Sequence, residues 1–300
     1  MATERSSPRY ANLELWNPED ILDSLIEGQF AAVAAVHAVR PAIESAALAI
    51  EARLRERGRL IYAGAGTSGR LAVQDGAELM PTFGWPEERL SLLMAGGHEA
   101  LLRSVEGAED MAEQGELLTE QQRINADDVL VAVAASGTTP FTLACMREAR
   151  RRGALTIGMA NNRSTPILEE SDHPILLDTG AESIAGSTRM KAGTAQKIAL
   201  NVLSSLVMIL LGKVHQGLMI DVRISNAKLV RRGVDMLVQL TGRSSDEARN
   251  ALERAENNVK LAALLLHGCE LEPAKSLLNQ SAGRLRRALD LLNARRPETT

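Results

Sequence analysis

The chain has 300 residues, 45% of them hydrophobic, so it can bury a substantial core in one large domain with an accessory piece. A formal net charge of -4 excludes the general positive field that holds a nucleic acid, and an aromatic content of 2% leaves few rings to stack on bases. Cys145 and Cys269 lie far apart and have no metal-binding or redox spacing, so we expect buried thiols in a reducing compartment.

The first residues are charged and polar where a secretory signal would have an apolar run, which predicts a cytoplasmic protein. The most apolar stretch covers residues 199–212 and contains Asn201, Ser204 and Ser205. It is shorter than the roughly 20 residues that cross a bilayer. We therefore interpret it as a buried helix and expect no membrane partner.

Residues 1–54 are expected to form a helical segment after a polar leader, with Asn17 and Pro18 at the start of the helix. Short β-prone runs then alternate with longer helical segments. The β-prone runs are residues 59–66, 90–96, 128–136, 155–161 and 173–180. This alternation predicts an α/β domain over residues 55–241, a doubly wound five-stranded parallel sheet with helices on both faces.

A long helical run from Ser187 to about Gly212 closes the predicted sheet domain. The pattern changes again over residues 242–300, where three short amphipathic segments predict a small bundle of three helices. Ser244 or Ser245 is expected to cap the first of them.

The first candidate site is the loop GAGTSGR at residues 64–70, because ligands of parallel sheets bind at the carboxyl ends of strands. Thr67 and Ser68 offer hydroxyls, Gly66 permits close backbone approach, and the following helix adds unpaired N–H groups, as in phosphate-binding loops. Two alternatives are a structural tight turn and a dinucleotide-binding motif. The dinucleotide motif is disfavoured because Glu88, about twenty residues on, sits in a polar turn.

The second candidate site is the loop ASGTTP at residues 135–140, which places Ser136, Gly137, Thr138 and Thr139 directly after another strand. By itself it could be an ordinary helix cap. Beside the first loop at the same sheet edge, it would form the second wall of one phosphate pocket. Hydroxyls and amides hold phosphate without a metal, and no His, Cys or carboxylate cluster has ligand spacing, so we expect no metal and no cofactor.

The third candidate is the run GSTRMKAGTAQK at residues 186–197, which supplies Ser187, Thr188 and Lys191 at the beginning of a helix. Cations near a helix amino end are disfavoured by the helix dipole, so their placement indicates an anionic neighbour. The alternative is that these cations are solvated or paired with acidic residues.

Four motifs together resemble one family. GAGTSGRLAVQDGAELMPTFG, EGAED at residues 106–110, ASGTTP and GSTRMKAGTAQK occur in the order and approximate spacing of the N-acetylmuramic acid 6-phosphate etherase family. The resemblance covers nearly the whole chain and implies a sugar isomerase (SIS) fold with a small C-terminal domain similar to ubiquitin-associated (UBA) domains. The related glucokinase regulatory proteins bind sugar phosphates without turning them over.

The resemblance implies cleavage of the D-lactyl ether of N-acetylmuramate 6-phosphate to N-acetylglucosamine 6-phosphate and D-lactate, by elimination across C2 and C3 and addition of water. It also implies that Glu78 is the acid for the departing lactyl oxygen and the base for water, and that Glu109 handles the C2 proton or holds the sugar. From the residues alone, either glutamate would be read as a solvated side chain. The chain departs from the family pattern at Leu79 and Met80, where Cys and Pro are usual, and at Thr138, where Arg is common.

Helix geometry suggests how Glu78 could reach a substrate. If residues 68–78 form one helix, its ends are roughly 15 Å apart, which is longer than a hexose phosphate. We therefore expect a homodimer in which Glu78 serves a site of the partner subunit. The alternative functions are a regulatory sugar-phosphate-binding protein and an aldose-ketose isomerase. A transcription regulator is disfavoured because no basic helix-turn-helix segment precedes residue 50.

Overall fold

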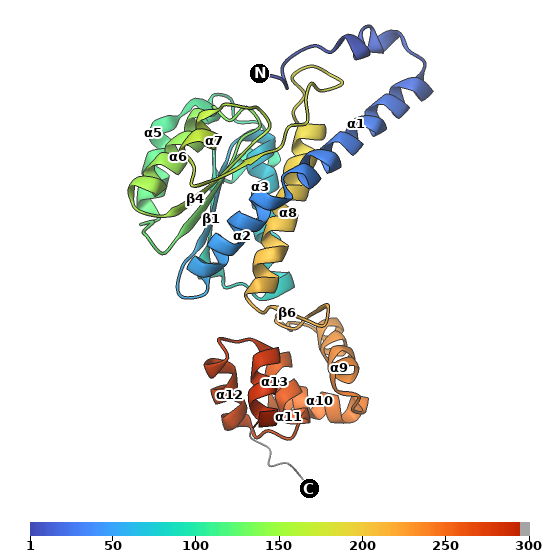
Figure 1. Cartoon of the computed structure of the whole chain (residues 1–300), viewed down its shortest axis with the longest axis vertical. Coiled ribbons are helices and arrows are strands. Elements are labelled where there is room, and N and C mark those ends of the chain that lie inside the picture. The colour runs from blue at the N-terminus through green and yellow to red at the C-terminus, as the bar shows by residue number, and fades with distance from the viewer. Residues whose placement is uncertain (295–300) are drawn as a thin grey trace. The chain divides into compact units, whose positions relative to one another are not determined.

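The N-terminal helical segment is two helices in the computed structural model, which describes residues 1–294 (Figure 1). Short 3-10 turns at Pro8–Tyr10 and Leu13–Leu15 precede α1 (Pro18–Ala38) and α2 (Arg40–Leu54). As predicted, α1 begins at Pro18, and the Asn17 side chain accepts a hydrogen bond from the backbone N–H of Asp20. The helices separate at Val39 because Pro41 has no N–H to donate and therefore begins a new helix.

The sheet has five parallel strands in the order β2-β1-β3-β4-β5, which confirms the predicted fold class. The strands are β1 (Leu60–Gly64), β2 (Leu90–Met94), β3 (Val129–Val133), β4 (Leu155–Ala160) and β5 (His173–Leu176). Every residue of β1 and β3 is buried, as expected for central strands covered on both faces.

Helices cover both faces of the sheet. Their bounds are α3 (Gly66–Phe83), α4 (Glu99–Leu102), α5 (Ala112–Gln121), α6 (Pro140–Arg151), α7 (Pro166–Glu170) and α8 (Lys191–Leu210), with 3-10 turns at Glu87–Arg89 and Ala108–Asp110. Helices α5, α6 and α7 lie on one face, and α2, α3 and α8 lie on the other (Figure 1). Phe141, Cys145 and Met146 of α6 pack against Leu130 of β3 in the core of the first face.

A buried carboxylate joins the second helical layer to the sheet. Asp75 of α3 accepts hydrogen bonds from the Tyr62 hydroxyl of β1 at 2.8 Å and the Ser204 hydroxyl of α8 at 3.1 Å. Burial raises the pKa of Asp75 above its usual 3.8, although these hydrogen bonds oppose the shift.

Replacing Asp75 by asparagine is expected to change how stability depends on pH. The folded wild type binds the Asp75 proton more tightly than the unfolded chain does, so its stability falls as the pH rises from about 3.8 through the raised pKa. Asp75→Asn lacks this titration, so its free energy of unfolding should rise relative to the wild type over the same window. Urea unfolding of both proteins at several pH values measures the difference, and a constant difference would contradict the assignment.

The chain forms two compact units by its internal contacts. One contains Met1–Ala77 and Glu88–Leu206, and the other contains Glu78–Glu87 and the chain from Val207 onward. The second unit includes the hairpin β6 (Val214–His215) and β7 (Leu218–Met219), followed by α9 (Ala227–Thr241), α10 (Ser245–Arg254), α11 (Val259–Leu266), α12 (Leu271–Gln280) and α13 (Leu285–Ala294).

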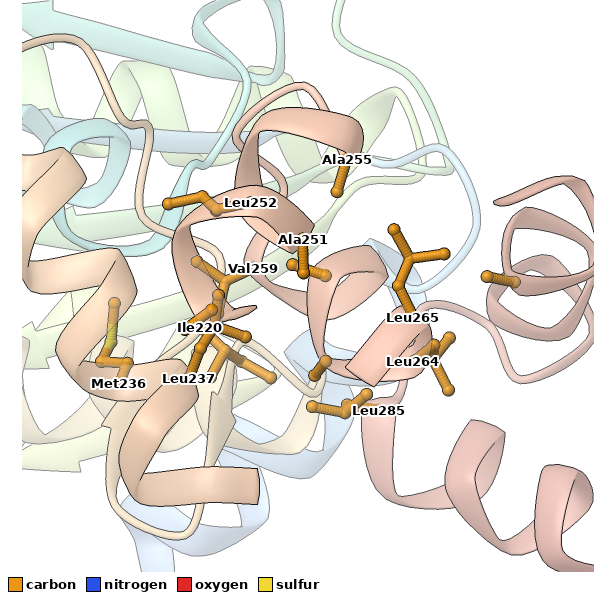
Figure 2. Packing of buried hydrophobic residues seen from close by; sticks show 14 of the residues in the cluster. Ile220, Met236, Leu237, Ala251, Leu252, Ala255, Val259, Leu264, Leu265 and Leu285 are labelled. Carbon is orange, nitrogen blue, oxygen red and sulfur yellow. The ribbon is translucent and has the colours of Figure 1, made fainter. Parts of the chain in front are cut away.

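The core of the second unit extends into α9, which sequence analysis assigned to the sheet domain. Met236 and Leu237 of α9 pack in one cluster with Leu252 of α10 and Leu264 of α11 (Figure 2). Gly242, chosen as the domain boundary, has a φ of 68° and ends α9 as a left-handed cap. A helix stop and a domain boundary therefore look alike in the sequence.

Four helices follow Gly242 within the described residues, rather than the three expected. The third predicted segment is divided between α12 and α13 because Ala282 and Gly283 both have positive φ. Ser244, one of the two serines predicted to cap this helix, caps α10 and forms a capping box with Glu247.

Helices α1 and α8 are each long and apolar enough to cross a membrane by length and composition alone. Half of the apolar window of α8 and 28% of the apolar window of α1 are buried inside the structure. This burial agrees with the interpretation of residues 199–212 as part of a buried helix.

Candidate active site

A pocket of about 330 Å³ lies at the carboxyl ends of β1 and β3, whose last residues Gly64 and Val133 are paired in register. These two neighbouring strands are followed by α3 and α6, which lie on opposite faces of the sheet. Such a switch point opens a crevice between the two loops. The pocket is lined by Glu4, Ala65, Gly66, Thr67, Ser68, Glu109, Asp110, Ala134, Ala135, Ser136, Thr138, Thr139, Pro140 and Thr188.

The first wall of the pocket is the loop after β1. Gly66 has a φ of 53°, and Thr67 and Ser68 follow in the first turn of α3, where backbone N–H groups lack helical partners. The glycines also have a packing role, because a Cβ on Gly69 would lie 2.7 Å from the backbone carbon of Gly64. The loop therefore makes a tight turn between strand and helix, as the structural alternative predicted. It also offers the hydrogen-bond donors of a phosphate site.

The second wall is the loop after β3. Ser136 Oγ lies 3.2 Å from Thr139 Oγ1 and accepts a hydrogen bond from the Thr138 N–H at 3.2 Å. The side chain of Thr139 makes no capping hydrogen bond to α6, so its hydroxyl is not used as an ordinary helix cap. Gly137 is buried and does not line the pocket, but its φ of 73° makes the turn that presents its neighbours.

Only part of the third run reaches the pocket. Thr188 lines it, whereas Ser187 and Lys191 do not, and the Lys191 side chain is buried. The carboxylate of Glu182, 1% exposed, accepts hydrogen bonds from the backbone N–H groups of Lys191 at 3.2 Å and Ala192 at 2.9 Å. The anionic neighbour of this helix start is therefore a residue of the chain itself.

The pKa of Glu182 reflects its buried position beside this helix start. Burial raises the pKa of Glu182, while the N–H groups of Ala192 and Lys191 and the charge of Lys191 act in the opposite direction. Glu182 is therefore bonded to the backbone of the third run, and the charge of Lys191 acts on it from nearby.

The two predicted catalytic glutamates differ in position. Glu109 lies in the 3-10 turn Ala108–Asp110 and lines the pocket with an exposed side chain. Glu78 is exposed near the end of α3, belongs to the second compact unit, and does not line the pocket. Because α3 is one continuous helix, Ser68 and Glu78 are about 15 Å apart along its axis.

Two charged lining residues, Glu4 and Asp110, were not predicted from the sequence. Asp110 lies within the EGAED motif and could have been found there. Glu4 belongs to the polar leader, and no local pattern indicates that the leader returns to the sheet edge. Asn162, which bonds the leader, follows β4 at that same edge, but nothing in the sequence links it to the leader.

The charged side chains that line the pocket are Glu4, Glu109 and Asp110, all of them carboxylates. A phosphate there would be held by backbone N–H groups and hydroxyls, and the carboxylates would face the uncharged part of a ligand. Within residues 1–294, no group of three or more His, Cys, Asp or Glu side chains is placed to hold a metal ion. Both cysteines are free and buried as expected, and burial raises the pKa of Cys145 to about 12.

Two families match the chain by sequence. The glucokinase regulatory protein N-terminal SIS domain matches residues 42–150, and the SIS domain matches residues 105–206. A phosphoheptose isomerase from Francisella tularensis has a similar structure, with a TM-score of 0.47 and 21% identity, over 65% of this chain and 98% of that one. The sugar isomerase domain of a transcription factor from Sphaerobacter thermophilus has a TM-score of 0.46 and 20% identity, over 64% and 90%.

Curated relatives match almost from end to end. The N-acetylmuramic acid 6-phosphate etherase of Deinococcus radiodurans is 48% identical over 96% of this chain and 94% of its own length. N-acetylmuramic acid 6-phosphate etherase 2 of Vibrio cholerae is 42% identical over 97% and 95%. At this identity and coverage, the chain belongs to the N-acetylmuramic acid 6-phosphate etherase family, whose members are carbon–oxygen lyases.

Proposed function

We propose that this protein cleaves the D-lactyl ether of N-acetylmuramate 6-phosphate, producing N-acetylglucosamine 6-phosphate and D-lactate. The observation that carries the proposal is the pocket at the switch point, where hydroxyls from two loops meet beside the Glu109 carboxylate. The names of the full-length relatives support the same substrate. The proposed location is the cytoplasm, since both cysteines are free thiols.

Phosphate binding is assigned to the two walls of the pocket. The backbone N–H groups at the start of α3 and the hydroxyls of Thr67 and Ser68 form one side. The hydroxyls of Ser136, Thr138 and Thr139 form the other, and Thr188 contributes from the third run. Gly66 and Gly137 shape the two turns. Ser187 and Lys191 support the run from outside the pocket lining.

The reaction is an elimination followed by a hydration. In the open-chain sugar, the Glu109 carboxylate removes the proton from C2, and the electron pair forms the C2–C3 double bond as the C3–O bond breaks. Glu78 donates a proton to the departing lactyl oxygen. Glu78 then takes a proton from water as the water oxygen adds to C3, and Glu109 returns to C2 the proton that it removed. The net change is the consumption of one water.

Incubation with N-acetylmuramate 6-phosphate tests the function directly. Release of D-lactate together with N-acetylglucosamine 6-phosphate is the expected result. The two alternatives make different products: a regulatory sugar-phosphate-binding protein releases nothing, and an aldose-ketose isomerase rearranges a sugar phosphate without lactate. A purified, folded protein that binds the sugar phosphate but releases no lactate would contradict the etherase proposal.

The site is proposed to be shared between two subunits of a homodimer. Glu78 is exposed about 15 Å along α3 from Ser68, a distance longer than the sugar. Helix α1 also presents an apolar stripe that the described chain leaves uncovered, as expected of a subunit contact. The stripe consists of Leu22, Ile26, Phe30 and Val33, each at least 50% exposed.

Mixing two inactive variants is expected to restore activity. Glu78→Ala retains an intact phosphate wall, and Ser68→Ala retains the acid, so a mixed dimer has one site with both groups. After complete subunit exchange, lactate release should reach about a quarter of the wild-type specific activity, because half of the dimers are mixed and each has one intact site. Each variant alone is the control, and no recovery after verified exchange would contradict a shared site.

A further inference from the structure

The first residues of the chain are fastened to the carboxyl edge of the sheet by one buried side chain. The amide oxygen of Asn162 accepts hydrogen bonds from the backbone N–H groups of Ala2 at 2.7 Å and Thr3 at 3.3 Å. The amide nitrogen of Asn162 donates to Thr3 Oγ1 and to the Ala135 carbonyl oxygen, both at 2.9 Å. Asn162 is 3% exposed and Thr3 is fully buried, so the segment is held by a satisfied interior network.

The same segment is also tied to the third run. The backbone N–H of Gly186 donates to the carbonyl oxygen of Thr3 at 3.1 Å. The first residues therefore link two walls of the pocket. Asn162 connects them to Ala135, which precedes Ser136, and Gly186 connects them to the run that contains Thr188. Because both of those loops form walls of the pocket, the residue that follows Thr3 is placed at the pocket by its backbone.

That residue is Glu4, and its side chain lines the pocket. A Cβ on Gly186 would lie 2.9 Å from Glu4 Oε2, so glycine at this position leaves room for the carboxylate. The carboxylate makes no hydrogen bond or ion pair with the described residues. Glu4 is exposed, so its backbone is fixed at the pocket while its carboxylate stays available to accept hydrogen bonds from a ligand.

We propose that Glu4 is a further substrate-binding residue, whose carboxylate accepts hydrogen bonds from O–H or N–H groups of the sugar. A carboxylate repels phosphate, so its place is beside the uncharged part of the ligand rather than the phosphate. Thr3 and Asn162 are positioning residues that act through it. This inference rests on the proposed function, because it assigns Glu4 to the sugar phosphate that the pocket binds.

Replacing Glu4 by alanine is expected to lower kcat/KM for lactate release from N-acetylmuramate 6-phosphate by about tenfold to a hundredfold, since a hydrogen bond to a charged group is lost. Glu4→Gln, which keeps one carbonyl acceptor, should lose less. Glu14→Gln is the matched control, because Glu14 is an exposed glutamate of the same leader that does not line the pocket.

Inhibition by inorganic phosphate distinguishes sugar binding from a structural effect. Phosphate has no sugar, so its inhibition constant should stay within about twofold of the wild type in Glu4→Ala if only a sugar contact is lost. Weaker phosphate inhibition would indicate a distorted pocket and would overturn the proposal. Tighter phosphate inhibition with unchanged kcat/KM would show that Glu4 is only a repelling charge, which would also overturn it.

A second variant tests the positioning of Glu4. Thr3→Val removes the hydroxyl that accepts a hydrogen bond from Asn162. Introduced alone, it should lower kcat/KM, but introduced together with Glu4→Ala it should cause no loss beyond that of Glu4→Ala. If the fold-decreases in kcat/KM caused by the two substitutions instead multiply in the double variant, Thr3 does not act through Glu4. A wild type that releases no lactate would count against the proposed function, whereas an active wild type with a fully active Glu4→Ala would count against this inference alone.

Discussion

Glu78→Gln is expected to reduce lactate release from N-acetylmuramate 6-phosphate by about 10² to 10⁴-fold, the usual contribution of a positioned acid–base group. Glutamine keeps the shape of the side chain but cannot donate a proton to the departing oxygen or accept one from water. Because Glu78 is exposed on α3, the substitution should change the free energy of unfolding by no more than about 0.5 kcal/mol. Lactate assays and urea unfolding measure the two effects separately.

Glu87→Gln provides the control for Glu78. Glu87 is also an exposed glutamate, and it belongs to the same short segment, Glu78–Glu87, of the second compact unit. It should retain wild-type lactate release and stability. Full activity of Glu78→Gln, with the Glu87 variant equally active, would remove Glu78 from the mechanism and leave Glu109 to be tested next.

Gly137→Ala is expected to impair both stability and phosphate binding. A Cβ at position 137 would overlap Thr165 Oγ1 and would lie 2.5 Å from Thr165 Cβ, and the φ of 73° is unfavourable for alanine. The loop that carries Ser136 and Thr138 must therefore move. We expect a cost of about 1–2 kcal/mol from the left-handed backbone and about 1–3 kcal/mol more from overpacking, with KM rising at least about tenfold.

Gly97→Ala separates these two costs. Gly97 has a φ of 66°, and a Cβ there would meet no atom within 4 Å, so only the backbone term applies. Urea unfolding of both variants measures the difference, and KM for N-acetylmuramate 6-phosphate reports the effect on the pocket. Equal destabilisation by the two substitutions, with unchanged KM, would contradict the requirement for glycine at 137.

Local features of the fold were predictable because they depend on nearby residues. The start of α1 was recognised from proline at the first helical position after Asn17, and the start of α10 from the capping serines Ser244 and Ser245. The five strands were recognised from short apolar runs between turn residues, and the first two candidate loops follow directly from strand ends. One continuous helix over residues 68–78 was also predicted, and α3 spans these residues.

Domain limits were less predictable, because the local signals resemble one another. Gly242 ends a helix within the second unit, but its sequence signal is the same as that of a domain boundary. The division between α12 and α13 depends on the backbone at Ala282 and Gly283, inside a run that reads as one helix.

The sequence by itself determined the five strands and the alternating helices of the sheet domain, where several helices start, and which loops carry hydroxyls and glycines. Only the tertiary structure decided that β1 pairs with β3, which brings those loops together, that Glu182 is the anion beside Lys191, and that Glu4 returns to the pocket. Caps and propensities act over a few residues, whereas strand order and buried contacts such as Thr3 with Asn162 depend on packing between residues that are distant along the chain.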